Sequence, residues 1–587
     1  MKKEVSILVV FLLLFFLFSC DKNDDPIQNS LNFGSLNLDF EIRSYDKPSW
    51  PDYWGVGGEG FVITLDDEEK HSGILSLKME REGDRNNNFG VFVASLPVKA
   101  LAGKELDYRC WIKTKGVKNG YAGLWLRVDG VNSTLGFDNM GNRGLQGDNE
   151  WVQVSIKMNI HPATTNISFG GLFPGEGTVW YDDIELYIDK EKYIDLVPKT
   201  ELSQQDIAAI KKYIYPLRTY EPDRGNTNDL EALDKLIDKS KVVALGEVSH
   251  GSSEIYKMKN RIIQYLVINN GFDIFSIEGN MPEAYKLNDY SVRGEGYPKK
   301  LIAGMYFWTW RTEEVLNMVE WMRRFNHNEQ RIAFTGFDMQ YYQGAVNELD
   351  DAFKDNDEIK TKISALRTKI SVGYANISVN DRKEIDEILS ILQNSIETSS
   401  FQKSEKEWLK QNIVIVQQYL DRSNNVLNWR DKCMADNAIW IKDHNPKSKL
   451  ILWAHNGHIM KTDDVMGFHL DQKLGKDYVT FGFTFYNGHY TATGSKGLTS
   501  YEAQQAYSGT LEYMLNQLDE PIFILDMKKI KSDKQNDTKW LLESINYRRV
   551  GAVGGLENEF QRRKVADDFD YLIFIKTSTP STLFPDP

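Results

Sequence analysis

Short apolar runs alternate with amphipathic stretches through the second half of the chain, and this alternation limits the fold more than any other feature. Runs of strand length lie at residues 241–247, 272–280, 331–338, 450–458, 478–485, 521–527 and 571–577. Helical periodicity follows the first run at 253–269 and precedes the third at 312–325. Such alternation is typical of a largely parallel sheet with helices on both faces. We therefore predict an α/β domain over residues 205–587.

One long segment of this domain has no strand-like run. Apolar residues recur every three or four positions at 359–370 and at 385–396, and a further helical pattern runs through Trp408 and Val416. These stripes predict a helical insertion at 345–440 between two strands of the sheet. Apolar residues at helical spacing usually form core, so we assign them to packing and not to a cofactor.

The segment before the α/β domain has a different pattern. Short alternating runs recur at 61–65, 74–79, 108–114, 123–128, 151–158 and 179–188, without a convincing helix. This spacing predicts an all-β sandwich, jelly-roll-like, over residues 35–190, with a linker at 191–204. Four of its tryptophans are candidates either for stacking on a carbohydrate or for the core, and these are Trp50, Trp54, Trp111 and Trp125.

The first twenty residues have the composition of a targeting segment. Lys2 and Lys3 precede the apolar run 5–18, which is too short for a comfortable membrane span but suits a signal peptide. The run ends in a small residue and Cys20, as in a bacterial lipobox, whereas an ordinary signal peptide with an incidental cysteine is the alternative. We predict a lipoprotein signal at 1–20, lipidation of Cys20 and a polar tether at 21–34. The protein would then lie in the cell envelope, at the outer membrane or cell surface.

Charge and cysteine usage exclude some functions. The 587-residue chain has a net charge of −14 and no long basic run, so nucleic acid is not an expected partner. Its three cysteines show neither a disulfide framework nor a zinc motif. Apolar residues make up 41% of the chain, which is enough for the cores of two or three domains.

Acidic and basic side chains follow four of the predicted strands at the point where each strand ends. The residues concerned are Glu247 and His250, Glu278, Asp338, and His455 with His458. Because ligands of open parallel sheets bind beyond the carboxyl ends of the strands, we expect these side chains to gather at one edge. One such residue alone would be weak support, but several at corresponding strand ends indicate a reactive site.

The same segments resemble the erythromycin esterase family. The resemblance rests on GEVSHGSSEIYKMKNRIIQYLV, SIEGNMPEAYKLNDYSVRG, FWTWRTEEVLNMVEWMRRFN, FTGFDMQ, WRDKCMADNAIWI and LWAHNGHI, in this order. It covers most of residues 205–587 and implies a hydrolase that cleaves an ester, for some members the macrolactone of a macrolide. It further implies six catalytic residues, which are His250, Glu247, Glu278, His455, His458 and Arg311.

The residue types fit ester hydrolysis by water. No G-x-S-x-G elbow or Cys–His motif offers a covalent nucleophile, although Ser249 and Ser252 flank His250. We expect His250 to take a proton from water, with Glu247 or Glu278 orienting its ring. His455, His458 and Arg311 would then stabilise the oxyanion. A small-molecule ester is the expected substrate, and no cofactor is expected.

Two other interpretations use the same residues. A divalent metal held by His250, Glu278, His455 and His458 would make the protein a metal-dependent hydrolase or peptidase. Alternatively, the residues could bind haem or another ligand without catalysis. The paired carboxylates favour hydrolysis, since haem ligation does not require them.

Overall fold

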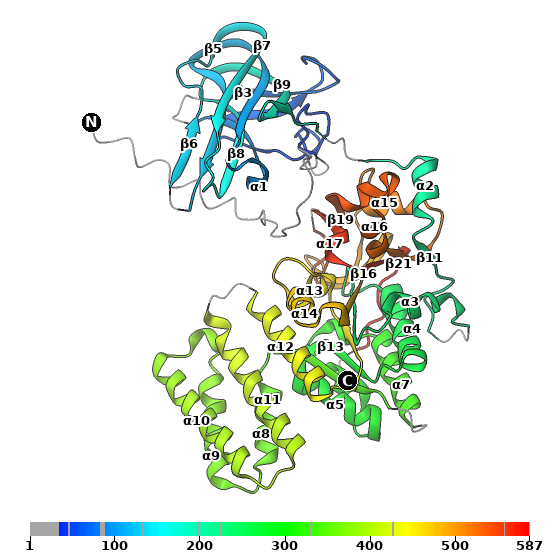
Figure 1. Cartoon of the computed structure of the whole chain (residues 1–587). Helices are drawn as coiled ribbons and strands as arrows, with labels where there is room; N and C mark the ends of the chain where they lie inside the picture. Colours follow the sequence, from blue (N-terminus) through cyan, green and yellow to red (C-terminus); the bar gives the residue numbers. More distant parts are fainter. Residues whose placement is uncertain are drawn as a thin grey trace. The chain divides into compact units, whose positions relative to one another are not determined.

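The computed structural model describes residues 35–44, 47–82, 88–131, 133–195, 199–222, 226–327, 331–424, 428–556 and 558–585. The predicted signal peptide with Cys20 and the tether at 21–34 lie outside these ranges. No helix within them is long and apolar enough to cross a membrane. The chain divides into two compact units between residues 198 and 199, and Figure 1 shows the chain coloured along its sequence.

The N-terminal unit is built from antiparallel strands. They are β1 (Gly55–Gly57), β2 (Phe61–Asp66), β3 (Ser76–Arg81), β4 (Gly90–Ser95), β5 (Glu105–Asp129), β6 (Thr134–Asp138), β7 (Leu145–Asn159), β8 (Asn166–Phe173), β9 (Glu176–Ile188) and β10 (Glu191–Lys192). One short helix, α1 (Val98–Leu101), lies between β4 and β5. The path of pairing is β1-β4-β8-β5-β9-β3-β2, with β10, β6 and β7 attached at its side.

Strand β5 connects two groups of strands, whereas the sequence predicts two separate strands there. Its first half pairs with β7 and β9 and its second half with β6 and β8. Gly116 and Asn119, both with positive φ, lie between the halves and let the backbone change direction. Aromatic rings from both groups meet in one core, for example Phe92 of β4 and Tyr181 of β9 at 5.0 Å.

The four candidate tryptophans have different environments. Trp54 is 5% exposed and packs against Phe92 and Phe169, so it belongs to the core. The other three, Trp50, Trp111 and Trp125, are partly exposed.

The C-terminal unit contains one mixed sheet in the order β11-β18-β21-β16-β12-β15-β13-β14. Its strands are β11 (Ile214–Pro216), β12 (Val242–Leu245), β13 (Ile274–Asn280), β14 (Ala333–Asp338), β15 (Leu450–Trp453), β16 (Tyr478–Gly494), β18 (Ile522–Asp526) and β21 (Tyr571–Ser578). From β21 to β14 neighbouring strands are parallel, whereas β18 is antiparallel to β21 and β11 to β18. Strand β17 (Gly497–Glu502) extends β16 as a hairpin, and β19 (Ile545–Arg548) pairs with β20 (Phe560–Arg563) separately.

Both faces of this sheet are covered, and the neighbouring central strands β12 and β15 are accordingly apolar at every position. In β15, Leu450 and Leu452 join one core cluster while Ile451 and Trp453 join the other. The helices outside the insertion are α2 (Gln204–Ile210), α3 (Ala232–Ile237), α4 (Ser253–Asn270), α5 (Met281–Arg293), α6 (Pro298–Ala303), α7 (Glu313–His327), α13 (Asn456–Ile459), α14 (Met466–Leu474), α15 (Leu511–Asn516), α16 (Met527–Asp533) and α17 (Val565–Asp568).

Among the described residues, five α-helices lie between β14 and β15, where the sequence predicts a helical insertion. They are α8 (Gln343–Ala352), α9 (Asp357–Ile370), α10 (Val379–Thr398), α11 (Lys403–Leu420) and α12 (Trp429–His444). The predicted apolar stripes are buried in their common core, as Ile363 and Leu392 show. Figure 1 shows α8 to α11 packed side by side, with α12 leading back towards the sheet.

Candidate active site

The loop after β12 carries a histidine and a carboxylate in direct contact. Nδ1 of His250 lies 2.7 Å from Oε1 of Glu247. The Glu247 side chain is fully buried, whereas 14% of the His250 side chain is exposed. A carboxylate bound to Nδ1 fixes the ring with its proton on that nitrogen and leaves Nε2 free to accept a proton.

Two buried donors fix the other oxygen of the same carboxylate. Oε2 of Glu247 accepts hydrogen bonds from Nζ of Lys259 at 2.8 Å and from Nε1 of Trp453 at 2.7 Å. The Lys259 ammonium also lies 4.1 Å above the Trp453 ring. Burial lowers the pKa of Lys259 to about 8, although the charge of Glu247 acts in the opposite direction. Glu247 therefore has a fixed orientation, because Lys259, Trp453 and His250 all hold it.

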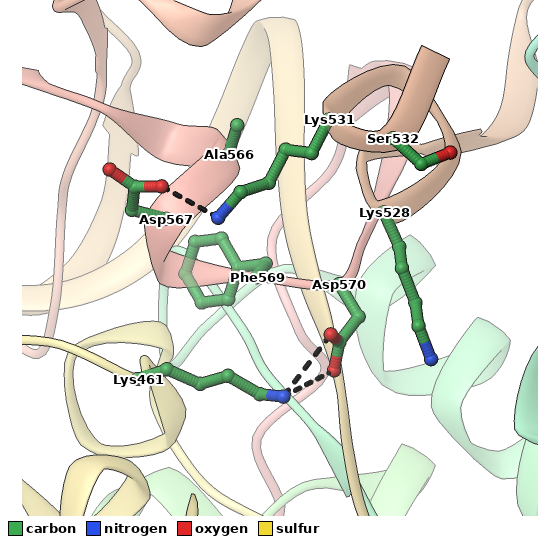
Figure 2. A pocket seen from close by; sticks show the side chains of 8 residues that line it. All are labelled: Lys461, Lys528, Lys531, Ser532, Ala566, Asp567, Phe569 and Asp570. Carbon is green, nitrogen blue, oxygen red and sulfur yellow. Dashed lines mark hydrogen bonds and ion pairs between the residues drawn. The ribbon is translucent and has the colours of Figure 1, made fainter. Parts of the chain in front are cut away.

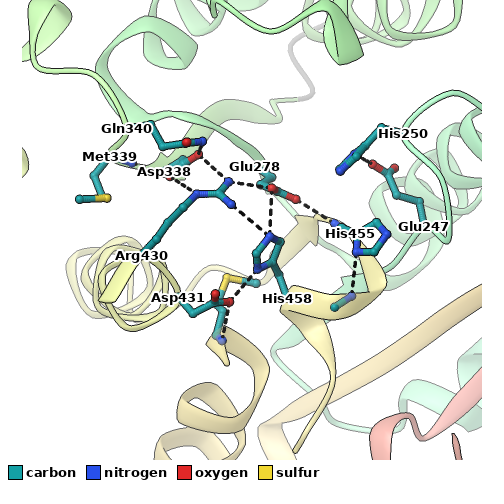
Figure 3. A network of polar contacts seen from close by, with 12 residues as sticks. Glu247, His250, Glu278, Asp338, Met339, Gln340, Arg430, Asp431, His455 and His458 are labelled. Carbon is teal, nitrogen blue, oxygen red and sulfur yellow. Dashed lines mark hydrogen bonds and ion pairs between the residues drawn. The ribbon is translucent and has the colours of Figure 1, made fainter. Parts of the chain in front are cut away.

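A second group of charged side chains surrounds Arg430 at the start of α12 (Figure 3). Its Nη2 donates to Glu278 Oε1 at 2.7 Å and to Asp338 Oδ2 at 2.8 Å, and its Nε donates to Asp338 Oδ1 at 3.1 Å. Burial alone would raise the pKa of Glu278, but the charges of His458, Arg430 and His250 hold it well below its usual range. Glu278 is therefore ionised at neutral pH.

His458 connects Arg430 with Asp431, the next residue of α12. Its Nδ1 lies 2.7 Å from Asp431 Oδ1, and its Nε2 lies 3.1 Å from Arg430 Nη1 and 3.4 Å from Glu278 Oε1. Burial lowers the pKa of His458, but the charge of Glu278 and the hydrogen bond to Asp431 outweigh it, so the pKa is raised. The environment thus favours the protonated ring.

His455 differs from its neighbours because both ring nitrogens contact the backbone. Nδ1 accepts from the Gly457 amide at 3.0 Å, which caps α13, and Nε2 lies 2.9 Å from the carbonyl oxygen of Val550. A carbonyl only accepts, so Nε2 carries the proton. Burial lowers the pKa of His455 well below its usual value, and the ring is neutral. The oxyanion role of His455 stays a prediction, and in this arrangement its N–H is donated to Val550.

The residues between the two histidines explain why the sequence reads His-Asn-Gly-His. Nδ2 of Asn456 donates to the Phe483 carbonyl, and Oδ1 accepts from the Phe483 amide. These two bonds hold the start of α13 against β16. A Cβ atom at Gly246 would lie 2.1 Å from Asn456 Oδ1, so this position requires glycine. The turn places His455 and His458 on two sides of Glu278, whose Oε2 accepts from the His455 amide at 2.9 Å.

The structure therefore brings together Glu247, His250, Glu278, His455 and His458, which we call the catalytic cluster, with Arg430 and Asp338 beside Glu278. Arg311 follows the short helix η3 (Trp308–Trp310), and its carbonyl accepts from the Phe584 amide. The basic side chain that contacts Glu278 and His458 is that of Arg430. Sequence reasoning missed this role, although Arg430 lies in the WRDKCMADNAIWI segment that carries the family resemblance.

Two residues of the metal-binding alternative, Glu278 and His455, are already bound within the protein. Among the described residues, no three or more His, Cys, Asp or Glu side chains are arranged to hold a metal ion. Glu278 is already bound by Arg430 and by the His455 amide, and the ring of His455 is bound by the backbone.

The two serines beside His250 have structural roles. Ser249 and Ser252 are both fully buried. Ser249 accepts from the Gly251 amide, and Ser252 caps α4 and accepts from Ser578. Neither side chain is presented to a substrate in this arrangement.

A separate pocket of about 350 Å³ lies elsewhere in this unit (Figure 2). It is lined by Lys461, Lys528, Lys531, Ser532, Ala566, Asp567, Phe569 and Asp570. Its charged groups are partly paired with one another, as Lys461 is with Asp570 and Lys531 with Asp567. Because none of its side chains belongs to the catalytic cluster, we assign the chemistry to the cluster and not to this pocket.

Comparison with known proteins agrees with the motifs. The model of the erythromycin esterase family matches residues 267–578, which is more than half of the chain. The chain belongs to the erythromycin esterase family. The matched range contains Glu278, Arg430, His455 and His458, whereas Glu247 and His250 lie before it.

Two relatives and one solved structure extend the comparison. "Putative hydrolase YbfO" of Bacillus subtilis is 23% identical over 422 residues, covering 64% of this chain and 91% of the relative. "Erythromycin esterase type II" of Escherichia coli is 26% identical over 333 residues, covering 48% and 78% respectively. The erythromycin esterase EreC, in its open conformation, matches with a TM-score of 0.50 and 16% identity over 63% of this chain and 99% of EreC. The C-terminal unit thus has an erythromycin esterase-like α/β fold, and family membership indicates a hydrolase.

Proposed function

We propose that this protein hydrolyses a carboxylic ester with a water molecule activated by His250. The observation that carries the proposal is the contact between His250 Nδ1 and a carboxylate that two further buried donors hold in place. This contact leaves Nε2 as the base. General-base catalysis of this kind contributes on the order of a hundred- to ten-thousand-fold to the rate.

Arg430 is our candidate for stabilising the oxyanion that forms when water attacks. About a quarter of its side chain is exposed, at 26%. A guanidinium has five N–H donors, and three of them are used in contacts with Asp338 and Glu278. A protonated His458 ring cannot accept a hydrogen bond, so both hydrogens of Nη1 remain to provide positive charge for the developing oxyanion.

The substrate we propose is a small-molecule ester, with a macrolide macrolactone as the first candidate. The name of the Escherichia coli relative supports this choice. Incubation with 14- and 16-membered macrolides, followed by mass spectrometry, should show a gain of one water with the wild type and none with His250→Ala. A product formed equally by His250→Ala would refute His250 as the base.

We propose that this chemistry requires no metal or other cofactor. Treatment with a chelator should then leave the rate of ester hydrolysis unchanged. An enzyme that EDTA inactivates and zinc or manganese restores would show that the cluster binds a metal.

For the N-terminal unit and the leader we propose an accessory and anchoring role. The unit would be a jelly-roll-like sandwich that binds carbohydrate through exposed aromatic rings, while lipidated Cys20 would attach the protein to the cell envelope. Cys20→Ala should release the protein from membrane fractions, and a variant that stays membrane-bound would contradict the lipid anchor.

Electrophoresis in gels that contain polysaccharide tests the carbohydrate ligand, because binding should slow the migration of the protein. A protein that migrates equally with and without the polysaccharide would contradict carbohydrate binding.

A further inference from the structure

Two tyrosine rings stack next to the catalytic cluster in a way that packing alone does not explain. The rings of Tyr306 and Tyr341 lie 4.2 Å apart at an angle of 33°. Tyr306 is 42% exposed, so the pair does not serve to fill a core. Tyr341 follows Asp338 by three residues, beyond the carboxyl end of β14 and thus at the sheet edge that carries the cluster.

The backbone of Tyr306 is held in an unfavourable conformation. Its φ is +71°, in the left-handed region that bulky residues rarely adopt. Such a conformation persists only where the surroundings enforce it, and it is concentrated at functional positions. The side chain of Tyr306 is held as well, by a hydrogen bond of 2.6 Å from its hydroxyl to the buried carboxylate of Glu283.

Asn280 connects both tyrosines to β13, the strand that carries Glu278. Asn280 comes two residues after Glu278 in β13, and its side chain donates to Glu283. The same side chain accepts from the Tyr341 amide at 2.9 Å and donates to the Tyr341 carbonyl at 3.0 Å. The Tyr341 backbone and the Tyr306 hydroxyl are therefore both held to β13, and the two rings stack on each other.

The chain segment that carries Tyr306 also reaches the catalytic base. Trp310 lies at its other end, with its ring centre 6.5 Å from that of His250. Met305, the residue before Tyr306, packs on the backbone beside Glu278, since a Cβ atom at Gly279 would lie 3.3 Å from Met305 Sδ. The segment 305–310 thus extends from His250 to Tyr341 along the edge where the strands end.

We propose that Tyr306 and Tyr341 form an aromatic platform that binds the non-reacting part of the ester, and that they select substrates with a bulky, ring-bearing group over small esters. This inference rests on the proposed hydrolase function and adds a substrate class to it. Rigid aromatic surfaces bind apolar rings and the C–H faces of sugars at little entropic cost, because the rings need not be ordered on binding. Because the platform is fixed to β13, binding of the bulky group would place the ester carbonyl at the catalytic cluster.

The test compares two esters in the full-length protein. Ethyl acetate offers no bulky group, whereas 2-naphthyl acetate carries an aromatic ring, and acid release with a pH indicator reports both. The variants are Tyr306→Ala, Tyr341→Ala and Tyr306→Phe, the last of which keeps the ring and loses the bond to Glu283. Tyr285→Ala is the matched control, because Tyr285 is 40% exposed and stacks at 4.4 Å, but on Trp408 of the helical insertion.

We expect both alanine variants to lower kcat/KM for 2-naphthyl acetate by roughly tenfold, mainly through KM, while kcat/KM for ethyl acetate changes little. Tyr306→Phe should show a smaller loss, and Tyr285→Ala should behave as the wild type. Equal effects on both esters, or no effect on either, would overturn the platform while leaving the hydrolase intact. A wild type that cleaves neither these esters nor macrolides would instead refute the proposed function, and the platform with it.

Discussion

Replacing Glu247 by glutamine should disable the proposed base while keeping the size and shape of the side chain. In the wild type, Oε2 of Glu247 accepts from Lys259 and Trp453, and Oε1 accepts from His250. Glutamine has one oxygen and one NH₂ group, so it can accept hydrogen bonds on only one of these two sides. An NH₂ group turned towards Lys259 and Trp453 would leave two buried donors unpaired, at about 1–3 kcal/mol each.

The amide oxygen should therefore face Lys259 and Trp453, and the NH₂ group should face His250. Nδ1 of His250 must then accept, which moves the ring proton to Nε2, the nitrogen that should take the proton from water. We expect kcat to fall by up to about 10⁴-fold, the full contribution of a general base, which corresponds to about 5.5 kcal/mol.

Steady-state kinetics with a small ester measures the loss, and nitrogen NMR of the His250 ring reports the tautomer directly. Glu314→Gln is the matched control, since Glu314 is also buried and accepts from Ser253 at the start of α4 and from the Thr582 amide. A folded Glu247→Gln protein that keeps kcat within about threefold of the wild type would refute the reasoning. So would an unchanged tautomer.

Three further predictions test the rest of the arrangement. Arg430→Lys should lower kcat/KM by about a hundredfold, because an ammonium cannot replace the guanidinium contacts to Asp338 and Glu278; an unchanged kcat/KM would contradict the oxyanion role. The pKa of His458 is raised above about 6.5, so its contribution to stability is fully present below that pH and is lost as pH rises through the folded-state pKa. Urea unfolding of wild type and His458→Gln should thus give a difference that shrinks at alkaline pH, and a constant difference would contradict the shift. A chain beginning at Lys199 should fold and keep its activity on a soluble ester, since the division between the two units lies there; circular dichroism and kinetics check this, and an unfolded product would make the N-terminal unit part of the hydrolase.

The strand-end residues could be found from the sequence because their positions follow from topology. Once β12, β13, β14 and β15 are parallel neighbours, the residues after each strand must meet at one edge. Glu247, Glu278 and His458 needed no knowledge of side-chain contacts to be placed there.

Residues that reach the site from helices could not be found in this way. Lys259 lies in α4 and Arg430 in α12, within patterns that look like ordinary amphipathic helices. Nothing in such a pattern distinguishes a solvated cation from one that contacts a buried carboxylate. The role of His455 was unpredictable for a related reason, since the carbonyl that it contacts belongs to Val550, 95 residues later.

The three clustered histidines have separate tasks because their surroundings differ. Both ring nitrogens of His455 contact backbone groups, and its lowered pKa keeps the ring neutral. His458 faces Glu278 and Asp431, and its raised pKa favours the charged form, suited to stabilising an anion. His250 and His458 both have a carboxylate on Nδ1 and a partly exposed side chain, but Nε2 of His458 lies beside Arg430 and Glu278. Hydrolysis near neutral pH requires both a proton acceptor and a cation, and the different surroundings of these histidines provide both within one cluster. This division of roles accounts for three histidines where a single catalytic base would need only one.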